Sequence, residues 1–76
     1  DRPERAALQS EQAAAVRAAI LELPAHARTA LVLREYEGLS YKEIADSLDI
    51  PIGTVKSRLS DARQRLKTAL AEYMEG

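Results

Sequence analysis

The chain has 76 residues and a mass of 8.4 kDa, and a chain this short forms one small domain. Apolar residues make up 46% of it and are mainly aliphatic, with three tyrosines and no Trp or Phe. This composition is typical of a helical bundle. The absence of cysteine and the single histidine exclude a disulfide scaffold and a Cys/His zinc site. Without a signal peptide or a run of about 20 apolar residues, and with a net charge of −1, we expect a cytoplasmic protein, or a fragment of one, that does not insert into membranes.

The first part of the chain divides into a polar start and a helix. Residues 1–10 are irregular in pattern and suit an interdomain linker or the frayed start of a helix, since Pro3 is compatible with a first helical turn. The domain itself is expected over residues 11–76. Its first helix is predicted over residues 11–23, where alanines are frequent and larger apolar residues recur every three or four positions. Pro24 ends this helix.

Two more helices follow, and residues typical of helix caps separate them. The second is predicted over residues 25–36, and Gly38 after it fits a left-handed C-terminal cap. Ser40 and Glu43 have the spacing of a capping box, in which each side chain bonds the backbone N–H of the other residue. This pair predicts the start of a third, short helix. It ends at residues 49–51, because the residue before a proline disfavours the α conformation.

The fourth helix begins near residues 51–53 and has the strongest apolar periodicity in the chain. Its apolar stripe consists of Val55, Leu59, Ala62, Leu66, Leu70 and Tyr73. A short helix, a tight turn and a long helix form a helix-turn-helix. Ala45 allows the two helices to approach at their crossing, and Asp49 tolerates the left-handed conformation that such a turn often needs. We predict an all-α fold, a small four-helix domain containing a helix-turn-helix with a long C-terminal recognition helix.

Charge is distributed unevenly along the chain. Residues 1–50 contain six Lys/Arg and nine Asp/Glu, a net charge of −3, whereas residues 53–68 contain five Lys/Arg and only Asp61, a net charge of +4. This asymmetry points to a nucleic acid that docks on the fourth helix. A solvated helix face is the alternative explanation.

The outer face of the fourth helix has the chemistry of a major-groove helix. With 100° per residue and the stripe buried, the residues that point away from the core are Gly53, Ser57, Ser60, Asp61 and Gln64. The residues on the flanks are Thr54, Lys56, Arg58 and Arg63. Small or hydrogen-bonding centres suit base edges, and cationic or hydroxyl flanks suit phosphates. Gly53 would let the helix N-terminus approach a phosphate closely. A capped, solvated helix remains the alternative.

Two motifs stand out in the second half of the chain. They are Gly-Leu-Ser-Tyr-Lys-Glu-Ile-Ala at 38–45 and Pro-Ile-Gly-Thr-Val-Lys-Ser-Arg-Leu at 51–59, the latter followed by Ala62-Arg63. Together they resemble region 4 of the extracytoplasmic-function (ECF) sigma factors. Leu23-Pro24 fits the same pattern, and the resemblance covers about residues 11–72. It implies a C-terminal domain that recognises the −35 element of promoter double-stranded DNA at the nucleoid and docks on the β flap of the RNA polymerase core. An anti-sigma factor is expected as a further partner.

The resemblance also implies roles for single residues. Base-facing positions are Lys56, Ser57, Ser60 and Asp61, to which the helical wheel adds Gln64. Positions that contact the DNA backbone are Arg34, Tyr41, Thr54, Arg58 and Arg63, and Gly53 is expected at a phosphate. Asp61 departs from the pattern, since a basic residue can occur there in related factors. A carboxylate is repelled by phosphates but can accept a hydrogen bond from a cytosine amino group.

Other functions have weaker support in the sequence. No nucleophile–base arrangement or phosphate loop is present, so we expect no enzymatic activity, cofactor or small-molecule substrate. His26 is expected at the surface, and Tyr36 and Tyr73 at the core or its rim. One alternative is a LuxR-type response-regulator output domain, although these commonly have histidine where Arg58 stands. The other is a helical interaction module held mainly by an anti-sigma factor.

Overall fold

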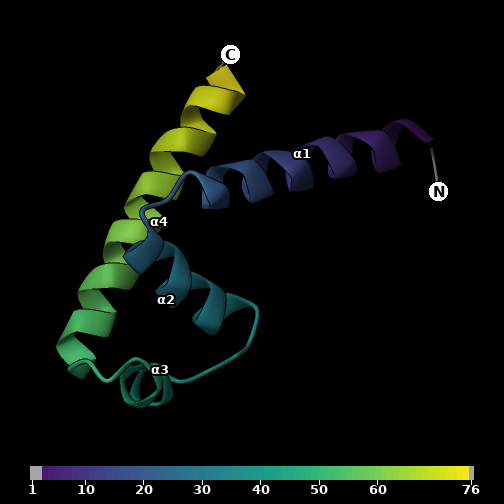
Figure 1. The fold of residues 1–76 in the computed structure, drawn as a ribbon. Helices are drawn as coiled ribbons and strands as arrows, with labels where there is room; N and C mark the ends of the chain where they lie inside the picture. The colour runs from purple at the N-terminus through teal and green to yellow at the C-terminus, as the bar shows by residue number, and fades with distance from the viewer. Residues whose placement is uncertain (1–2, 76) are drawn as a thin grey trace.

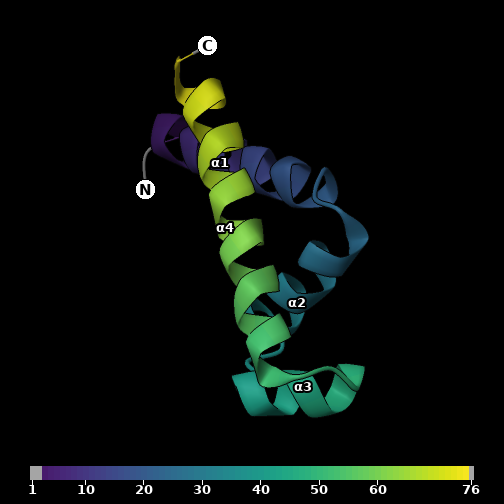
Figure 2. The same cartoon turned by 90° about the vertical axis from the view of Figure 1, so that its left-hand side faces the viewer.

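Four helices make up the computed structural model, which describes residues 3–75, with side chains over residues 10–73. In chain order they are α1 (Pro3–Leu21), α2 (Ala25–Glu35), α3 (Tyr41–Leu48) and α4 (Ile52–Glu75). The long helix α4 forms the spine of the molecule, with α2 and α3 against its N-terminal half and α1 crossing it further along (Figures 1 and 2). The predicted all-α, four-helix fold is confirmed. None of the helices in the described residues combines the length and apolar character that a bilayer span requires.

The first helix is longer at its start than the sequence pattern predicts. It begins at Pro3 instead of residue 11, and it ends at Leu21 instead of residue 23. A proline has no N–H to leave unbonded in a first turn, and its fixed φ suits a helix; the alanine-rich sequence that follows then sustains the helix. Figure 1 shows this N-terminal half extending away from the other three helices. The assignment of residues 1–10 to an interdomain linker or the frayed start of a helix stays a prediction.

Local signals set the link between α2 and α3 as predicted. The helix α2 ends at Glu35, and Gly38 adopts the left-handed conformation with φ 70°. A Cβ at Gly38 would meet no atom within 4 Å, so backbone conformation and not space favours glycine there. The N–H of Leu39 then donates to the carbonyl of Leu33 at 3.1 Å, which folds the chain back toward α2.

The capping box and the tight turn of the helix-turn-helix are both present. The N–H of Glu43 donates to Ser40 Oγ at 3.0 Å, and the N–H of Ser40 donates to Glu43 Oε1 at 2.8 Å. Asp49 is left-handed, with φ 55°, and the N–H of Ile50 donates to the carbonyl of Ala45 at 3.0 Å. The capping box and the tight turn thus hold α3 and α4 as the two helices of the predicted helix-turn-helix.

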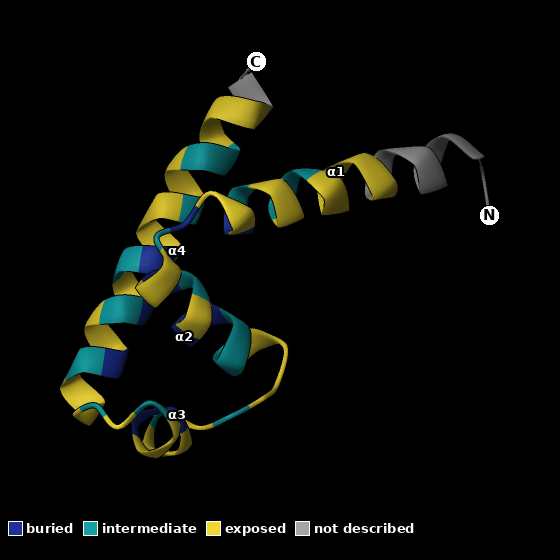
Figure 3. Ribbon diagram, in the orientation of Figure 1, coloured by how far each residue is buried: buried dark blue, intermediate teal, exposed yellow. Residues whose placement is uncertain are grey.

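The core lies where α1, α2 and α3 face α4 (Figure 3). Its buried members are Ile20, Leu23, Ala27, Ala30, Leu31, Ile44, Ala45, Val55, Leu59 and Ala62. The predicted stripe of α4 is buried at its first three positions and half-buried at Leu66 and Leu70. It does not continue to Tyr73, which is 46% exposed, because α4 extends beyond the helices that cover it (Figure 1). Tyr36, also expected at the core or rim, is 61% exposed.

Candidate nucleic-acid interface

A shallow hollow opens on one flank of α4, beside the start of α3. It has a volume of about 460 Å³. We call it the basic hollow, and its lining residues are Tyr41, Lys56, Ser60, Arg63, Gln64 and Lys67. Three of these are cations and none is acidic. The hollow therefore joins, on one surface, five residues that sequence reasoning had selected one by one.

Lys67 is the member of the basic hollow that sequence reasoning missed. It follows Arg63 by four residues and Lys56 by eleven, which are spacings of about one and three helical turns. Positions separated in this way lie on the same face of a helix. Helical spacing could thus have added Lys67 to the predicted set.

Tyr41 lies among positively charged side chains at the hollow. The guanidinium of Arg63, beside the Tyr41 hydroxyl, lowers the pKa of Tyr41, and partial burial opposes this effect. The positive charges of Arg34 and Lys56 act in the same direction as Arg63. A phenol whose anionic form is favoured in this way is a stronger hydrogen-bond donor toward an anion.

Arg34 has partners within the protein, behind Tyr41. Its Nη1 donates to the carbonyl of Leu39 at 2.9 Å, in a part-buried contact. Its Cζ lies 5.3 Å from the centroid of the Tyr41 ring, within the range of a cation–π contact. These contacts make Arg34 a support for Tyr41, whereas the predicted contact between Arg34 and the DNA backbone stays a prediction.

Arg63 bridges the hollow and α2. Its Nη2 lies 3.7 Å from Glu35 Oε2, and both side chains are about half exposed. The interaction with Tyr41 raises the pKa of Arg63, and the charge of Glu35 acts in the same direction. Arg63 is therefore a fixed cation that faces solvent and Tyr41 together.

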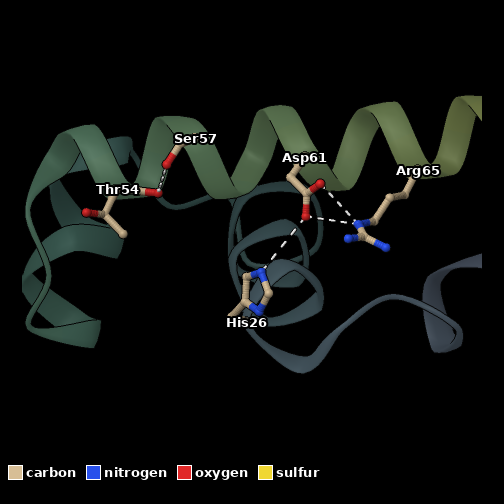
Figure 4. A network of polar contacts seen from close by, with 5 residues as sticks. All are labelled: His26, Thr54, Ser57, Asp61 and Arg65. Carbon is tan, nitrogen blue, oxygen red and sulfur yellow. Dashed lines mark hydrogen bonds and ion pairs between the residues drawn. The ribbon is translucent and has the colours of Figure 1, made fainter.

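Asp61 lies on the opposite flank of α4, away from the basic hollow. Both of its carboxylate oxygens accept from Arg65 Nε at 3.0 Å, and its Oδ2 lies 3.9 Å from Nε2 of His26 on α2 (Figure 4). The helical wheel placed this carboxylate on the outer face with the serines. In the structure it points toward α2 and is already engaged by Arg65.

The other predicted residues lie along the first two turns of α4. Ser57 is exposed and donates from Oγ to the carbonyl of Thr54 at 3.1 Å (Figure 4). Thr54 and Arg58 are half-buried and, at 100° per residue, lie on the flank that carries Asp61. Gly53 is exposed, and a Cβ there would meet no atom within 4 Å. The structure thus joins Lys56, Ser60 and Gln64 with Tyr41 and Arg63, and sets the remaining residues apart from them.

The chemistry of this surface is that of polyanion binding. Its functional groups are guanidinium, ammonium, hydroxyl and amide, which are the groups that contact phosphates and base edges. Across the residues that the structure describes, no three His, Cys, Asp or Glu side chains gather as a metal site would require. The hollow belongs to the second helix of a helix-turn-helix, which is the helix that enters the major groove in that motif.

Comparison with known proteins identifies the family. The model of the family described as "Sigma-70, region 4" matches residues 13–66. The RNA polymerase sigma-H factor of Pseudomonas aeruginosa is 52% identical over 68 residues, which are 90% of this chain and 35% of that protein. The ECF RNA polymerase sigma-E factor of Haemophilus influenzae is 43% identical over 74 residues, covering 97% of this chain and 39% of that protein.

A third relative is the ECF RNA polymerase sigma-E factor of Escherichia coli, 45% identical over 64 residues, which are 84% of this chain and 34% of that protein. The chain therefore spans little more than a third of the length of these relatives. The match sets aside the alternative of a LuxR-type output domain. It agrees with the motifs at 38–45 and 51–59, and the chain belongs to the region 4 family of the sigma-70 factors.

Proposed function

We propose that this chain recognises the −35 element of promoter DNA as the C-terminal domain of an ECF sigma factor, acting in the cytoplasm at the nucleoid. The observation that carries the proposal is the basic hollow on the exposed flank of α4. It offers two cations, Arg63 and Lys67, to phosphates, and Lys56 with the polar side chains of Ser60 and Gln64 to base edges. Such a division between positioning and readout is what sequence-specific DNA binding requires.

Within this proposal the residues have separate tasks. Lys56, near the start of α4, reaches guanine acceptors, and the base-facing polar residues Ser57, Ser60 and Gln64 lie deeper in the groove. The backbone-contacting residues are Tyr41, Gly53, Thr54, Arg58 and Arg63, with Arg34 supporting Tyr41 from behind. Phosphate contacts fix the register of the helix, and base contacts choose the sequence.

We also propose that the domain docks on the β flap of the RNA polymerase core and is held inactive by an anti-sigma factor. An apolar patch supports a protein partner. Leu21 is 69% exposed and Tyr36 is 61% exposed, and together with Arg17 and Ile20 they line a hollow of about 270 Å³ that shares no residue with the basic hollow. Docking on polymerase would raise the effective concentration of this small domain at its promoter.

The test begins with selection of bound duplexes from a randomised pool, because the target sequence is not known in advance. Affinity is then measured on the selected duplex and on a scrambled one, for the parent chain, Lys56→Ala and Arg63→Ala. Lys42→Ala is the matched control, since Lys42 is an exposed cation of α3 that pairs with Asp46 outside the hollow. Enrichment of one sequence, with losses in the two hollow variants alone, supports the proposal. No enrichment, or equal losses in all three variants, contradicts it.

A further inference from the structure

Among the described residues, the shortest ion pair of α4 lies outside the basic hollow. Arg65 Nε is 3.0 Å from both Oδ1 and Oδ2 of Asp61, one helical turn apart, and His26 Nε2 is 3.9 Å from Oδ2. The side chains of Asp61 and Arg65 are 39% and 54% exposed, so a polyanion can reach both. Asp61 is also the only acidic residue in the basic stretch 53–68. Its effect on any anion bound by α4 is therefore opposite to that of the other charged residues of this stretch.

The carboxylate of Asp61 occupies the position that a phosphate would take beside Arg65. An arginine binds carboxylate and phosphate through the same N–H donors. While Arg65 Nε is bonded to Asp61, the pair presents almost no net charge to DNA. The pair therefore attracts phosphates less than a free arginine would, and this difference is independent of base sequence.

We propose that Asp61 limits the affinity of α4 for DNA, because it holds Arg65 against the helix and so withholds one phosphate contact. This inference rests on the proposed function, because it concerns how the same helix binds DNA. Withholding a contact of this kind weakens binding to all duplexes equally. The ratio of affinities for the selected and the scrambled duplex, set by the base-facing residues near Lys56, is then unchanged, and the total affinity is lower.

The test uses Asp61→Asn, which keeps the size of the side chain and removes its charge. We expect this variant to bind the selected and the scrambled duplex more tightly than the parent chain. The slope of log affinity against log salt should steepen by about 0.9 for one added phosphate contact, so that the advantage of the variant shrinks about 3.5-fold between 50 and 200 mM salt. A change of this kind is not produced by a loss of helix packing.

Arg65→Ala tests whether Arg65 is the residue that makes the added phosphate contact. In the parent background it should weaken binding to both duplexes equally, because it leaves the Asp61 carboxylate without its compensating charge. In the Asp61→Asn background it should abolish the gain and restore the parent salt slope. Thermal unfolding of each variant confirms that equal amounts of folded protein are compared.

Three results would overturn the inference. Asp61→Asn that loses affinity on the selected duplex alone would make Asp61 a base contact, for example to cytosine. Unchanged affinity and slope would mean that Asp61 withholds nothing, and a gain that survives Arg65→Ala would mean that Arg65 is not the residue released. Failure of the proposed function is distinct, because then Lys56→Ala and Arg63→Ala would also leave binding unchanged.

Discussion

Arg34 stacks on the ring of Tyr41, with its guanidinium carbon 5.3 Å from the ring centroid, and the same guanidinium donates to the carbonyl of Leu39 at 2.9 Å. One side chain near the end of α2 thus fixes both the linking segment and the first residue of α3. The opposite edge of Tyr41, its hydroxyl, faces Arg63 of α4. Tyr41 therefore connects Arg34, which supports the helix-turn-helix from α2, to the surface of α4 that is proposed to bind DNA.

Arg34→Ala should destabilise the domain through loss of the bond to Leu39. The expected cost is about 1 kcal/mol for one intramolecular hydrogen bond, which corresponds to a fall in Tm of about 4–8 °C in a domain of this size. Arg28→Ala is the control, because Arg28 also donates to a backbone carbonyl, that of Leu21, but at the exposed surface. Circular dichroism melts of the two variants measure the difference. Equal melting temperatures would show that the part-buried contact adds nothing.

Tyr41→Phe should separate the two functions of Tyr41. The ring remains for Arg34 to stack on, so the Tm should change by less than a few degrees, whereas the hydroxyl that faces Arg63 is lost. DNA binding should weaken on selected and scrambled duplexes alike, as expected when a phosphate contact is removed. Melting curves and fluorescence anisotropy on the same preparation test both parts. A large fall in Tm with unchanged binding would assign Tyr41 to stability alone.

Leu59→Ala should be strongly destabilising, because Leu59 is 1% exposed at the centre of the core. Removing a buried leucine in this way typically costs about 2–5 kcal/mol, a large part of the stability of a small domain. The matched control is Leu21→Ala at a side chain that is 69% exposed, where the change should lie within about 0.5 kcal/mol. Urea denaturation of both variants provides the measurement. Similar midpoints would mean that the stripe of α4 does not form the core.

Stability should fall in acid because of the capping box of α3. The bonds from the backbone and side chain of Ser40 lower the pKa of Glu43 below its ordinary value of 4.5. Since the pKa is lower in the folded than in the unfolded state, this contribution is fully present above pH 4.5 and is lost as the pH falls through the folded pKa.

Glu43→Gln isolates this effect. Glutamine can still accept the Ser40 N–H bond but does not titrate. The difference in unfolding free energy between parent and variant should therefore shrink as the pH is lowered below 4.5. Thermal melts between pH 7 and pH 3 provide the comparison. A difference that stays constant across this range would show that Glu43 is not stabilised as a carboxylate.

The elements that sequence could predict are those specified by local chemistry. The Ser40–Glu43 box, the positive φ of Gly38 and Asp49, and the break before Pro51 each depend on neighbours within a few residues. The structure confirms all of them. The first three positions of the α4 stripe are also correct, because periodicity alone decides which side of a helix is buried.

Contacts between elements could not be predicted in the same way. A helical wheel describes one helix by itself, so it could not show that Asp61 lies near His26 of α2. It also could not show that α4 extends past the other helices, which leaves Tyr73 exposed. The early start of α1 was left open between a linker and a frayed helix start, because residues 1–10 lack the apolar spacing that predicts a helix.

The central claim is that α4 both positions itself on phosphates and reads bases, with Arg63 and Lys56 in these two roles. A salt titration of Arg63→Ala and Lys56→Ala against selected and scrambled duplexes tests it most directly. Arg63→Ala should weaken binding to both duplexes equally and lower the salt slope by about one unit. Lys56→Ala should cost about 1–3 kcal/mol on the selected duplex and much less on the scrambled one. Equal losses on both duplexes for Lys56→Ala, or a loss confined to the selected duplex for Arg63→Ala, would contradict the account.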